Sequence, residues 1–485
     1  MMIWPFNKSK SKQEAAKPVV SSRVVRARYD AAQTSIDNSR HWANADALSA
    51  DAAASSAVRN ILRMRARYEV SNNSYAKGIV LTLANDCIGT GPRLQMLTDN
   101  PSLNNAVEAA FSKWAKAVRL ADKLRTMRMA KVTDGEAFAM LTANPKIKSP
   151  VKLDLKPVEA DRFTNPEVRV SNYSDTDGIK LDRWGNPVEY AVLRHHPGQT
   201  SAIGLLNEFD WIPASAVLHW FRADRPGQHR GVGELSPALP LFAQLRRYTL
   251  AVLGAAETAA DFAAVLYTDG PASETGITAP EAMDVIELEK RMATVLPENW
   301  KLGQIKAEQP TTTHDAFTAK ILNEIARCLN MPFNVAAGNS SGYNYASGRL
   351  DHQVYFKSIS VERGHVEDVV LDPLLDAWIY EAMLTSELAP LRNMRDADHK
   401  WFWPGNEHVD PLKEANAQAT RLKNNTTTLA AEYAKSGIDW ENELRQRAKE
   451  KQLMRELGIT DENNTSNQNG NQEENIDEEE NAASV

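Results

Sequence analysis

Apolar residues recur at helical spacing through the first part of the chain. Residues 58–69 and 75–88 each follow such a pattern, and Gly89 stops the second. Further on, Val107, Phe111 and Trp114 are separated by four and three residues, which places them on one face of a helix. These patterns predict three helices before residue 120.

The pattern then changes from helical spacing to alternation. Residues 151–160 form one short strand-like run, and residues 178–196 form two, separated by the turn sequence WGNP. Helices followed by alternating segments predict one mixed α/β domain over residues 31–220.

A long helix is predicted to begin at Ser236-Pro237, with the serine as N-cap and the proline at the first helical position. It would span about 30 residues, or about 45 Å. A compact insert at about 267–313 follows, with strand-like pieces at Ala293–Leu296 and Trp300–Ile305. A second helix then occupies 314–330, and its apolar face is formed by Phe317, Ile321 and Ile325.

The stretch MPFNVAAGNSSGYNYASGRLD at 331–351 is rich in glycine, serine and asparagine. A lid over an active site, a phosphate cradle and a mobile loop are the three interpretations that its composition allows. After it, a long helix is predicted, with interruptions near Gly364 and Pro373. The string KWFWPG at 400–405 predicts a packing corner, since basic residues do not interleave with its aromatic ones.

Two polar helices are predicted near the C-terminus. The second has Asp439 as its N-cap and Gly458 as its C-cap. The low-complexity tail from 461 to 485 and the basic arm at 1–30 are both predicted to be disordered.

Charge is unevenly distributed along the chain. The net charge is −7, but the last 25 residues carry eight acidic groups and no basic ones, so the body is close to neutral. A neutral body argues against tight binding of nucleic acid through phosphates, because each such contact needs its own Lys or Arg. The two cysteines, Cys87 and Cys328, are far apart in apolar surroundings, which favours a reducing compartment. No apolar run approaches the roughly 18 residues that a membrane span needs.

Searches for chemical motifs find no catalytic set. GVGELS at 231–236 lacks the third glycine of a dinucleotide loop, and GxxxxGK[ST], HExxH and GxSxG are all absent. His195 and His196 are expected at an exposed hairpin end. Asp134 and Glu136 flank a glycine turn and could hold a metal, although such turn acids are usually solvated. We predict no catalytic residue, cofactor or metal.

The segment HWFRADRPGQHRG at 219–231 is dense in charge. An enzyme would use His219, Asp224 or His229 as acid and base. We favour a structural role, in which arginines form fork-type pairs with carboxylates at a domain or subunit junction. The arginines concerned are Arg222, Arg225 and Arg230.

Several strings in one order resemble the portal proteins of tailed bacteriophages, most closely the lambda-like portal family. They are YAKGIVLTLANDCIGTGPRLQ, DGEAFA, DRWGNPVEYAV, HWFRADRPGQHRGVGELSPAL and MPFNVAAGNSSGYNYASGRLD, and WFWPGNEHVDPLKEANA extends the likeness to about 417. The resemblance implies an α+β portal fold that assembles into a ring, typically of twelve subunits, at one capsid vertex.

The resemblance also implies a division of the chain into domains. It comprises an α/β wing at 31–235, stem helices at 236–330 with a clip insert at about 267–313, and a tunnel loop at 331–350. A long helix with the remaining wing at 351–404 and a helical crown at 405–460 follow. The arm at 1–30 and the tail at 461–485 match no family motif.

By the same resemblance, double-stranded DNA passes non-specifically through the ring. The partners implied are other copies of the chain, the terminase large subunit, head-completion or connector proteins, and the scaffold and major capsid proteins, with no membrane. The protein would belong to the virion, and to the host cytoplasm during assembly. ATP hydrolysis would reside in the terminase, which agrees with the missing Walker motif.

The loop is then expected to touch moving DNA with neutral side chains. Its candidate contacts are Asn339, Ser340, Ser341, Gly342, Tyr343, Asn344 and Tyr345. Possible basic residues of the stem lumen are Arg246, Arg247 and Lys320, although outward salt bridges are an equal alternative for them. Two other classes remain open: a metal-dependent enzyme acting on nucleic acid, and a scaffold or adaptor that forms no ring.

Overall fold

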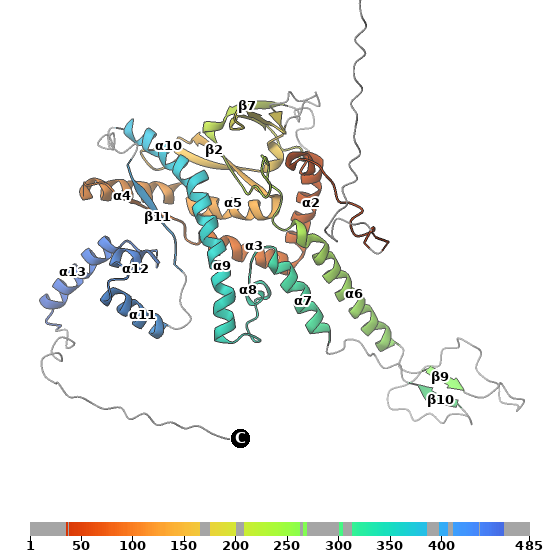
Figure 1. The fold of residues 1–485 in the computed structure, drawn as a ribbon. Coiled ribbons are helices and arrows are strands. Elements are labelled where there is room, and N and C mark those ends of the chain that lie inside the picture. Colours follow the sequence, from red (N-terminus) through yellow and green to blue (C-terminus); the bar gives the residue numbers. More distant parts are fainter. Residues whose placement is uncertain are drawn as a thin grey trace, which may run out of the picture. The chain divides into compact units, whose positions relative to one another are not determined.

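The computed structural model describes residues 35–36, 38–164, 175–199, 208–261, 265–268, 300–303, 313–385, 397–405, 411–435 and 437–459. By its internal contacts the chain divides into two units, Met1–Ser49 and Ala50–Val485. The described part of the first unit consists mainly of turns. All helices and strands named below belong to the second unit, which begins with the short helix α1, Ala50–Ala53 (Figure 1).

Three helices of the second unit pack against one another. They are α2 (Ser56–Asn72), α3 (Ser74–Ile88) and α5 (Leu120–Asp134). The first two confirm the helices predicted from periodicity. Asn73 separates them, and its side chain accepts the backbone N–H groups of Tyr75 and Ala76, which caps α3.

The third predicted helix is α4, Pro101–Ala117, and all three of its apolar residues are buried as expected. Strand β1 (Arg93–Met96) precedes it and pairs antiparallel with β11 (His399–Phe402), which lies about 300 residues later. Phe111 of α4 contacts the rings of Trp378 and Trp401. The aromatic string at 400–405 is therefore a packing corner, as predicted.

Two antiparallel sheets face each other above these helices, with strand orders β3-β2-β8 and β4-β5-β6-β7. Strand β2 alternates between two environments. Phe138 faces the second sheet, where it joins Phe163 and Tyr190, whereas Ala137 and Ala139 face the helices. The strands are β2 (Glu136–Ala143), β3 (Leu153–Val158), β4 (Asp175–Thr176), β5 (Ile179–Leu181), β6 (Pro187–Leu193), β7 (Phe209–Pro213) and β8 (Val217–Phe221).

The predicted hairpin around WGNP is confirmed. β5 and β6 pair antiparallel, and the turn between them is held by Asp182. Its carboxylate accepts hydrogen bonds from the Asn186 side chain and from the backbone N–H groups of Asn186 and Trp184, and these bonds lower the pKa of this aspartate.

The long helix is shorter than predicted and begins later. A 3₁₀ turn occupies Ser236–Ala238, and α6 spans Leu239–Asp261, or 23 residues. Ser236 is not an N-cap: its hydroxyl is buried and has no hydrogen-bond partner among the described residues. The 3₁₀ turn moves the start of α6 three residues downstream, which leaves the serine too far away to cap it.

Beyond α6 the structure describes one strand pair, β9 (Val265–Thr268) with β10 (Trp300–Gly303). The second of these confirms the strand predicted from Trp300, whereas the piece at 293–296 lies outside the described residues. Helix α7 (Thr313–Arg327) then runs beside α6 (Figure 1).

The predicted apolar face of α7 is only partly correct. Ile321 and Ile325 are buried, but Phe317 is 47% exposed. Its ring contacts Tyr248 of α6 on one side, and the rest of the ring is exposed.

The stretch at 331–350 is not irregular throughout. Helix α8 takes Phe333–Ala337, and α9 runs from Tyr345 to Val366, so the loop is narrowed to 338–344. The predicted break at Gly364 is wrong, because this glycine continues α9 at the modest cost that glycine has within a helix.

A π-helical turn (Glu367–Leu371) interrupts the helix just before Pro373, in agreement with the second predicted break. Proline has no N–H to donate to the carbonyl of Val369, so the regular ladder cannot continue. Helix α10 (Asp372–Met383) follows. Two side chains at this interruption bind the aromatic string at 400–405. The indole of Trp401 donates to Asp372 at 2.8 Å, and that of Trp403 donates to Glu367.

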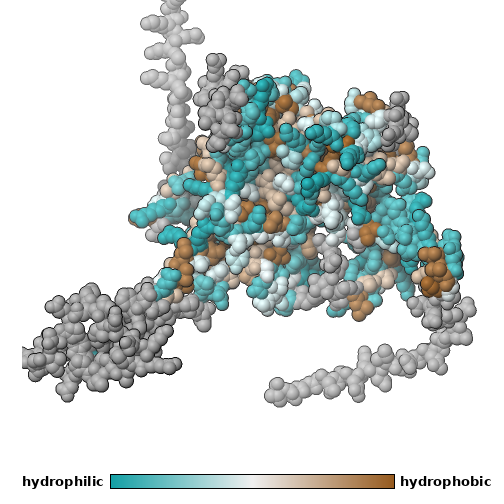
Figure 2. Space-filling model, turned by 180° about the vertical axis from the view of Figure 1, so that it is seen from behind, coloured by the Kyte–Doolittle hydropathy of each residue, from teal (hydrophilic) through white to brown (hydrophobic). Residues whose placement is uncertain are grey.

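Three helices complete the described chain: α11 (Pro411–Lys423), α12 (Leu429–Lys435) and α13 (Trp440–Glu456). Both predicted caps of the last helix are confirmed. The Asp439 carboxylate accepts the N–H of Glu441 at 2.9 Å, and Gly458 has φ +72° just past the end. Seen from behind, the surface carries hydrophobic residues in small groups between hydrophilic ones (Figure 2).

Candidate functional site

A buried carboxylate joins α2 to the segment that leads into α6. Glu136, the first residue of β2, is fully buried. Arg230 donates to both of its oxygens, at 2.9 and 2.6 Å. Arg63 of α2 and His219 of β8 add contacts of 3.3 and 3.1 Å. The predicted fork-type pair therefore exists for Arg230, and it lies within one chain.

The charge state of this cluster follows from its burial. Burial alone would raise the pKa of Glu136, but Arg230 and His219 hold it well below its ordinary value. Burial lowers the pKa of His219 from its ordinary value of 6.5, which favours the neutral imidazole at neutral pH. Its Nε2–H then donates to Glu136, while Nδ1 accepts from the Tyr190 hydroxyl at 3.4 Å. His219 is thus a structural hydrogen-bonding group.

Two glycine segments cross beside the cluster. Gly135 has φ +94°, and a Cβ atom there would lie 2.4 Å from the carbonyl carbon of Val232. A Cβ on Gly231 would lie 2.1 Å from the carbonyl oxygen of Gly135. Only glycine allows such close backbone contact. The strings DGEAFA and GVGELS therefore form one structural site, which sequence reasoning missed.

A second buried network ties α5 to α9. Arg128 of α5 donates to both oxygens of Glu234, at 3.2 and 3.0 Å. Lys131, which is fully buried, contacts Glu234 at 3.1 Å and Glu362 of α9 at 2.5 Å. Burial opposes the ionised form of Glu234, but these two cations lower its pKa to about 2. The start of α6 is thereby fixed to both α5 and α9.

The other two arginines of the 219–231 segment behave differently. Arg222 is half-exposed and pairs locally with Asp224 at 2.7 Å. The backbone N–H of Arg225 donates to the side chain of Gln228 at 3.2 Å. A role for these residues in subunit contacts stays a prediction.

Asp134 and Glu136 do not form a metal site with each other. Asp134 accepts two hydrogen bonds from Arg67, at 2.8 and 2.7 Å, whereas Glu136 is held by Arg230. The expectation that these acids are solvated is wrong, since both are buried. Gly135 ends α5 between them, so each carboxylate meets its own arginines. Among the described residues, no group of three or more potential ligands could hold a metal ion.

His229 and His196 each lie beside a carboxylate. His229 contacts the Asp51 carboxylate at 2.8 Å through Nδ1. His196, at the expected hairpin end, is partly exposed and lies 3.3 Å from Glu159.

The loop at 338–344 is largely exposed, and several of its polar groups are used within it. Asn339 accepts the N–H of Ser341 at 2.9 Å. Asn344 caps α9 by accepting the N–H of Ser347 at 2.9 Å. Tyr343 is half-buried, and burial raises the pKa of its hydroxyl. The side chain of Tyr345 lies outside the described residues. Ser340 and Ser341, beside Gly342, are exposed, and the Ser340 hydroxyl accepts a hydrogen bond from the Asn334 side chain at 3.4 Å.

The three basic residues proposed for the stem lumen have different surroundings. Arg246 of α6 donates to the Tyr68 hydroxyl at 3.1 Å and to the Asn72 carbonyl at 2.9 Å, both on α2. Arg247 and Lys320 are exposed. Arg246 therefore joins two helices of its own chain.

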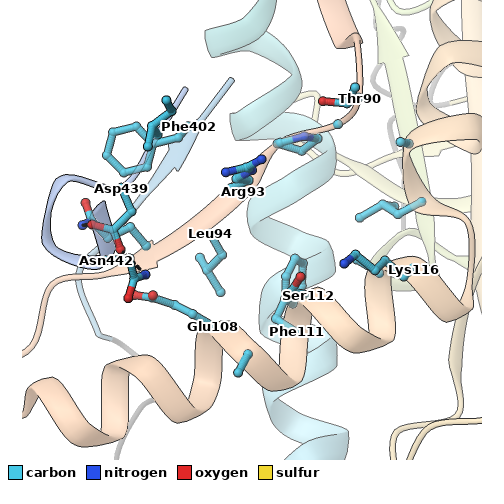
Figure 3. Close-up of a pocket in the computed structure, with 18 of the residues that line it drawn as sticks. Thr90, Arg93, Leu94, Glu108, Phe111, Ser112, Lys116, Phe402, Asp439 and Asn442 are labelled. Atoms are coloured by element: carbon cyan, nitrogen blue, oxygen red, sulfur yellow. Dashed lines mark hydrogen bonds between the residues drawn. The ribbon is translucent and has the colours of Figure 1, made fainter. Parts of the chain in front are cut away.

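A cavity of about 780 Å³ lies between α4, β1 and the start of α13 (Figure 3). Glu108 of α4 projects into it toward Asp439, and its carboxylate accepts the N–H of Met96 at 2.8 Å. Burial raises the pKa of Glu108 to about 7, and the nearby Asp439 and Glu441 act in the same direction. This carboxyl group titrates near neutrality.

Comparison with known proteins now places the chain. The family model described as phage portal protein, lambda family, matches residues 37–363, about two thirds of the sequence. The chain belongs to this family. A probable portal protein of Halomonas phage phiHAP-1 is 24% identical over 428 residues, which cover 82% of this chain and 81% of that protein.

The chain is also similar to solved structures, at lower sequence identity. The neck of an empty GTA particle, computed with C6 symmetry, has a TM-score of 0.47 at 14% identity, covering 77% of this chain and 93% of that one. An HK97 family phage portal protein from Corynebacterium diphtheriae has a TM-score of 0.31 at 11% identity, covering 73% and 98%. The family assignment rests on the sequence match.

Membership in this family bears on whether the chain is an enzyme or a structural protein. Portal proteins are structural components of the virion, which agrees with the expectation that the chain is not an enzyme. Within the described residues, no helix is both long and apolar enough to cross a bilayer.

Proposed function

We propose that this portal chain assembles into a ring, of about twelve copies by family analogy, at one vertex of a phage capsid. Double-stranded DNA would enter through the ring during packaging and leave through it during ejection. The observation that supports this proposal is the family match over residues 37–363. The match spans the mixed domain, helices α6 and α7, and the loop at 338–344.

The division into working parts is part of the proposal. Residues 31–235 would form the wing, with the remaining wing in 351–404. Helices α6 and α7 would form the stem, β9 and β10 would lie in the clip, and α11 to α13 would form the crown. The clip would meet the terminase large subunit during packaging and head-completion proteins afterwards. Scaffold and major capsid proteins would be the partners in the procapsid. A body near neutral charge supports a channel through which DNA slides, because phosphate contacts add barriers to sliding.

The loop at 338–344 is the proposed contact with DNA. It is exposed between α8 and α9, and its solvent-facing groups are neutral, with Ser340 and Ser341 at the tip. Such groups offer weak hydrogen bonds to phosphates without a fixed charge. The internal bonds of Asn339 and Asn344 give the loop a defined shape, so we assign these two residues to shaping the loop as well as to contact.

Negative-stain microscopy of the purified protein tests the ring. We expect particles with a central hole, and a monomer or dimer at all concentrations would instead indicate the non-ring adaptor. Deleting residues 339–344 should preserve rings but reduce packaged DNA and phage yield. A matched variant with six Gly and Ser residues in their place keeps the chain length, and it separates loss of loop side chains from strain on α8 and α9. Normal phage yield from both variants would refute the role of the loop.

A further inference from the structure

The last helix of the described chain carries a row of positive charge. Arg447, Lys451 and Arg455 follow one another at intervals of four residues along α13, so they lie on one side of the helix. All three side chains are exposed. Among the described residues none of the three forms an ion pair, whereas Arg445 pairs with Glu441 at 2.8 Å. We call these three residues the basic stripe.

The basic stripe destabilises the helix that carries it. Like charges four residues apart on a helix repel each other, and each such pair costs about 0.2–0.5 kcal/mol. Every residue of α13 from Arg445 to Glu456 is exposed, so packing against the core does not offset this cost. Hydrogen bonds from Gln446 to Glu450 and from Gln452 to Glu456 support the helix but do not involve the stripe. An anion bound along the stripe would therefore stabilise α13.

The sequence supplies such an anion directly after the helix. Residues 461–485 include eight acidic groups and no basic ones, and six of the acidic groups fall within 473–480, which we call the acidic segment. The stripe is about 12 Å long, since a helix rises 1.5 Å per residue. The chain from Glu456 to Glu473 can span up to about 60 Å, so the acidic segment can reach the whole stripe. Linkage within one chain also raises the effective concentration of the acids at the stripe.

We propose that the acidic segment binds the basic stripe of α13 and keeps it from the phosphates of DNA. The two are opposite in charge, and the acidic segment has more charges than the stripe. Without it, each copy in a ring would offer the stripe to passing phosphates, and such contacts resist sliding. This consequence for DNA rests on the proposed function, whereas the contact itself needs only a single chain.

A crosslink of zero length tests the contact directly. Carbodiimide joins a carboxylate to a lysine amine as an amide, and Lys451 is the lysine of the stripe. Lys449 is the matched control, because it is exposed on the opposite side of α13 and has the same linkage to the acidic segment. The two sides of a helix are about 10 Å apart, close to the screening length in 0.1 M salt, so we expect about threefold more crosslinks from Lys451 than from Lys449. Equal yields, measured by mass spectrometry of the full chain, would overturn the proposal.

Neutralising the acidic segment tests its effect on DNA. The variant E473Q/E474Q/D477N/E478Q/E479Q/E480Q keeps the chain length and removes the six charges. It should bind a short DNA duplex at least about tenfold more tightly than wild type in 0.1 M salt, because the stripe becomes available to phosphates. Adding R447Q/K451Q/R455Q should remove this gain. The control removes the same charge from three exposed lysines of α3 and α4, as K77Q/K113Q/K116Q, and should leave the gain intact.

Two results of the binding assay would contradict the proposal. Wild type could bind the duplex through the stripe as tightly as the neutralised variant, which would make DNA itself the occupant. The gain could also persist after R447Q/K451Q/R455Q, which would place its cause outside the stripe. Mass photometry of the same samples reports whether rings are present. Absence of rings from wild type would refute the proposed function and leave the crosslinking result standing, so the two failures are distinguishable.

Discussion

Replacing Arg230 by methionine should destabilise the sheet region strongly. The side chain is 2% exposed, and it donates to both oxygens of Glu136 and to the carbonyls of Phe163 and Asp177. Methionine has a similar length but no donor, so Glu136 would stay buried with its main partner gone. Breaking a buried pair in this way costs roughly 3–5 kcal/mol. Arg63 and His219 remain near the carboxylate, so we expect the lower part of this range.

The measurement is thermal unfolding at a protein concentration where mass photometry shows monomers. A loss of about 3 kcal/mol corresponds to a fall in the melting temperature of about 6–12 °C for a domain of this size. The control R222M removes an exposed, local pair with Asp224, which is worth at most about 1 kcal/mol.

A double variant tests whether the loss of stability comes from the unpaired carboxylate of Glu136. E136Q/R230M removes both charges, and it should recover part of the stability lost in R230M because the uncompensated buried carboxylate is gone. A melting temperature for R230M within 2 °C of wild type, or no recovery in the double variant, would refute the assignment of this pair as the main electrostatic constraint on the domain.

Three further outcomes follow from the geometry. Glu234 has its folded pKa lowered to about 2, so its contribution to stability is complete above the unfolded value near 4.5 and is lost as pH falls toward 2. In E234Q the free energy of unfolding should therefore depend less on pH in the acid range, as measured by unfolding experiments between pH 5 and 3. Glu108 has its folded pKa raised to about 7, so its ionisation lowers stability progressively as pH rises from the unfolded value near 4.5 to 7. E108Q should therefore raise the melting temperature at pH 8 and have a much smaller effect at pH 5. G135A should reduce soluble, folded protein by placing a Cβ atom against Val232 in a left-handed backbone, as measured by expression yield and circular dichroism.

Periodicity in the sequence predicted the elements whose apolar side faces the core and whose polar side faces solvent. The helix around Phe111 and the hairpin at WGNP have one apolar side and one polar side, so the pattern and the packing agree. The same periodicity located α2 but could not show that its apolar side, with Val58, Ile61, Met64 and Tyr68, faces outward. An apolar stripe has the same spacing whether it faces the core of its own chain or the surface.

Long-range charge pairs were beyond sequence reasoning for a different reason. Glu136 and Arg230 are 94 residues apart, and the acid was expected to be solvated because turn acids usually are. The two glycines that allow the crossing were visible, but a glycine does not identify its backbone partner. By contrast, the true start of α9 had a local signal: Asn344 three residues before Ser347 is an N-cap arrangement, and the glycine-rich composition obscured it.

The two buried networks and the outer face of α2 are parts of one arrangement. The arginines that α2 turns inward neutralise the carboxylates beside the glycine crossing, and the apolar residues of the same helix are left for the surface. Glu234 follows that crossing directly and is held by α5, which is also joined to Glu362 of α9. The α2 surface, the start of α6 and the helix that carries the loop are therefore linked by buried ion pairs. Because breaking any of these pairs leaves an uncompensated buried charge, separating these elements would cost several kcal/mol more than separating elements joined by exposed ion pairs.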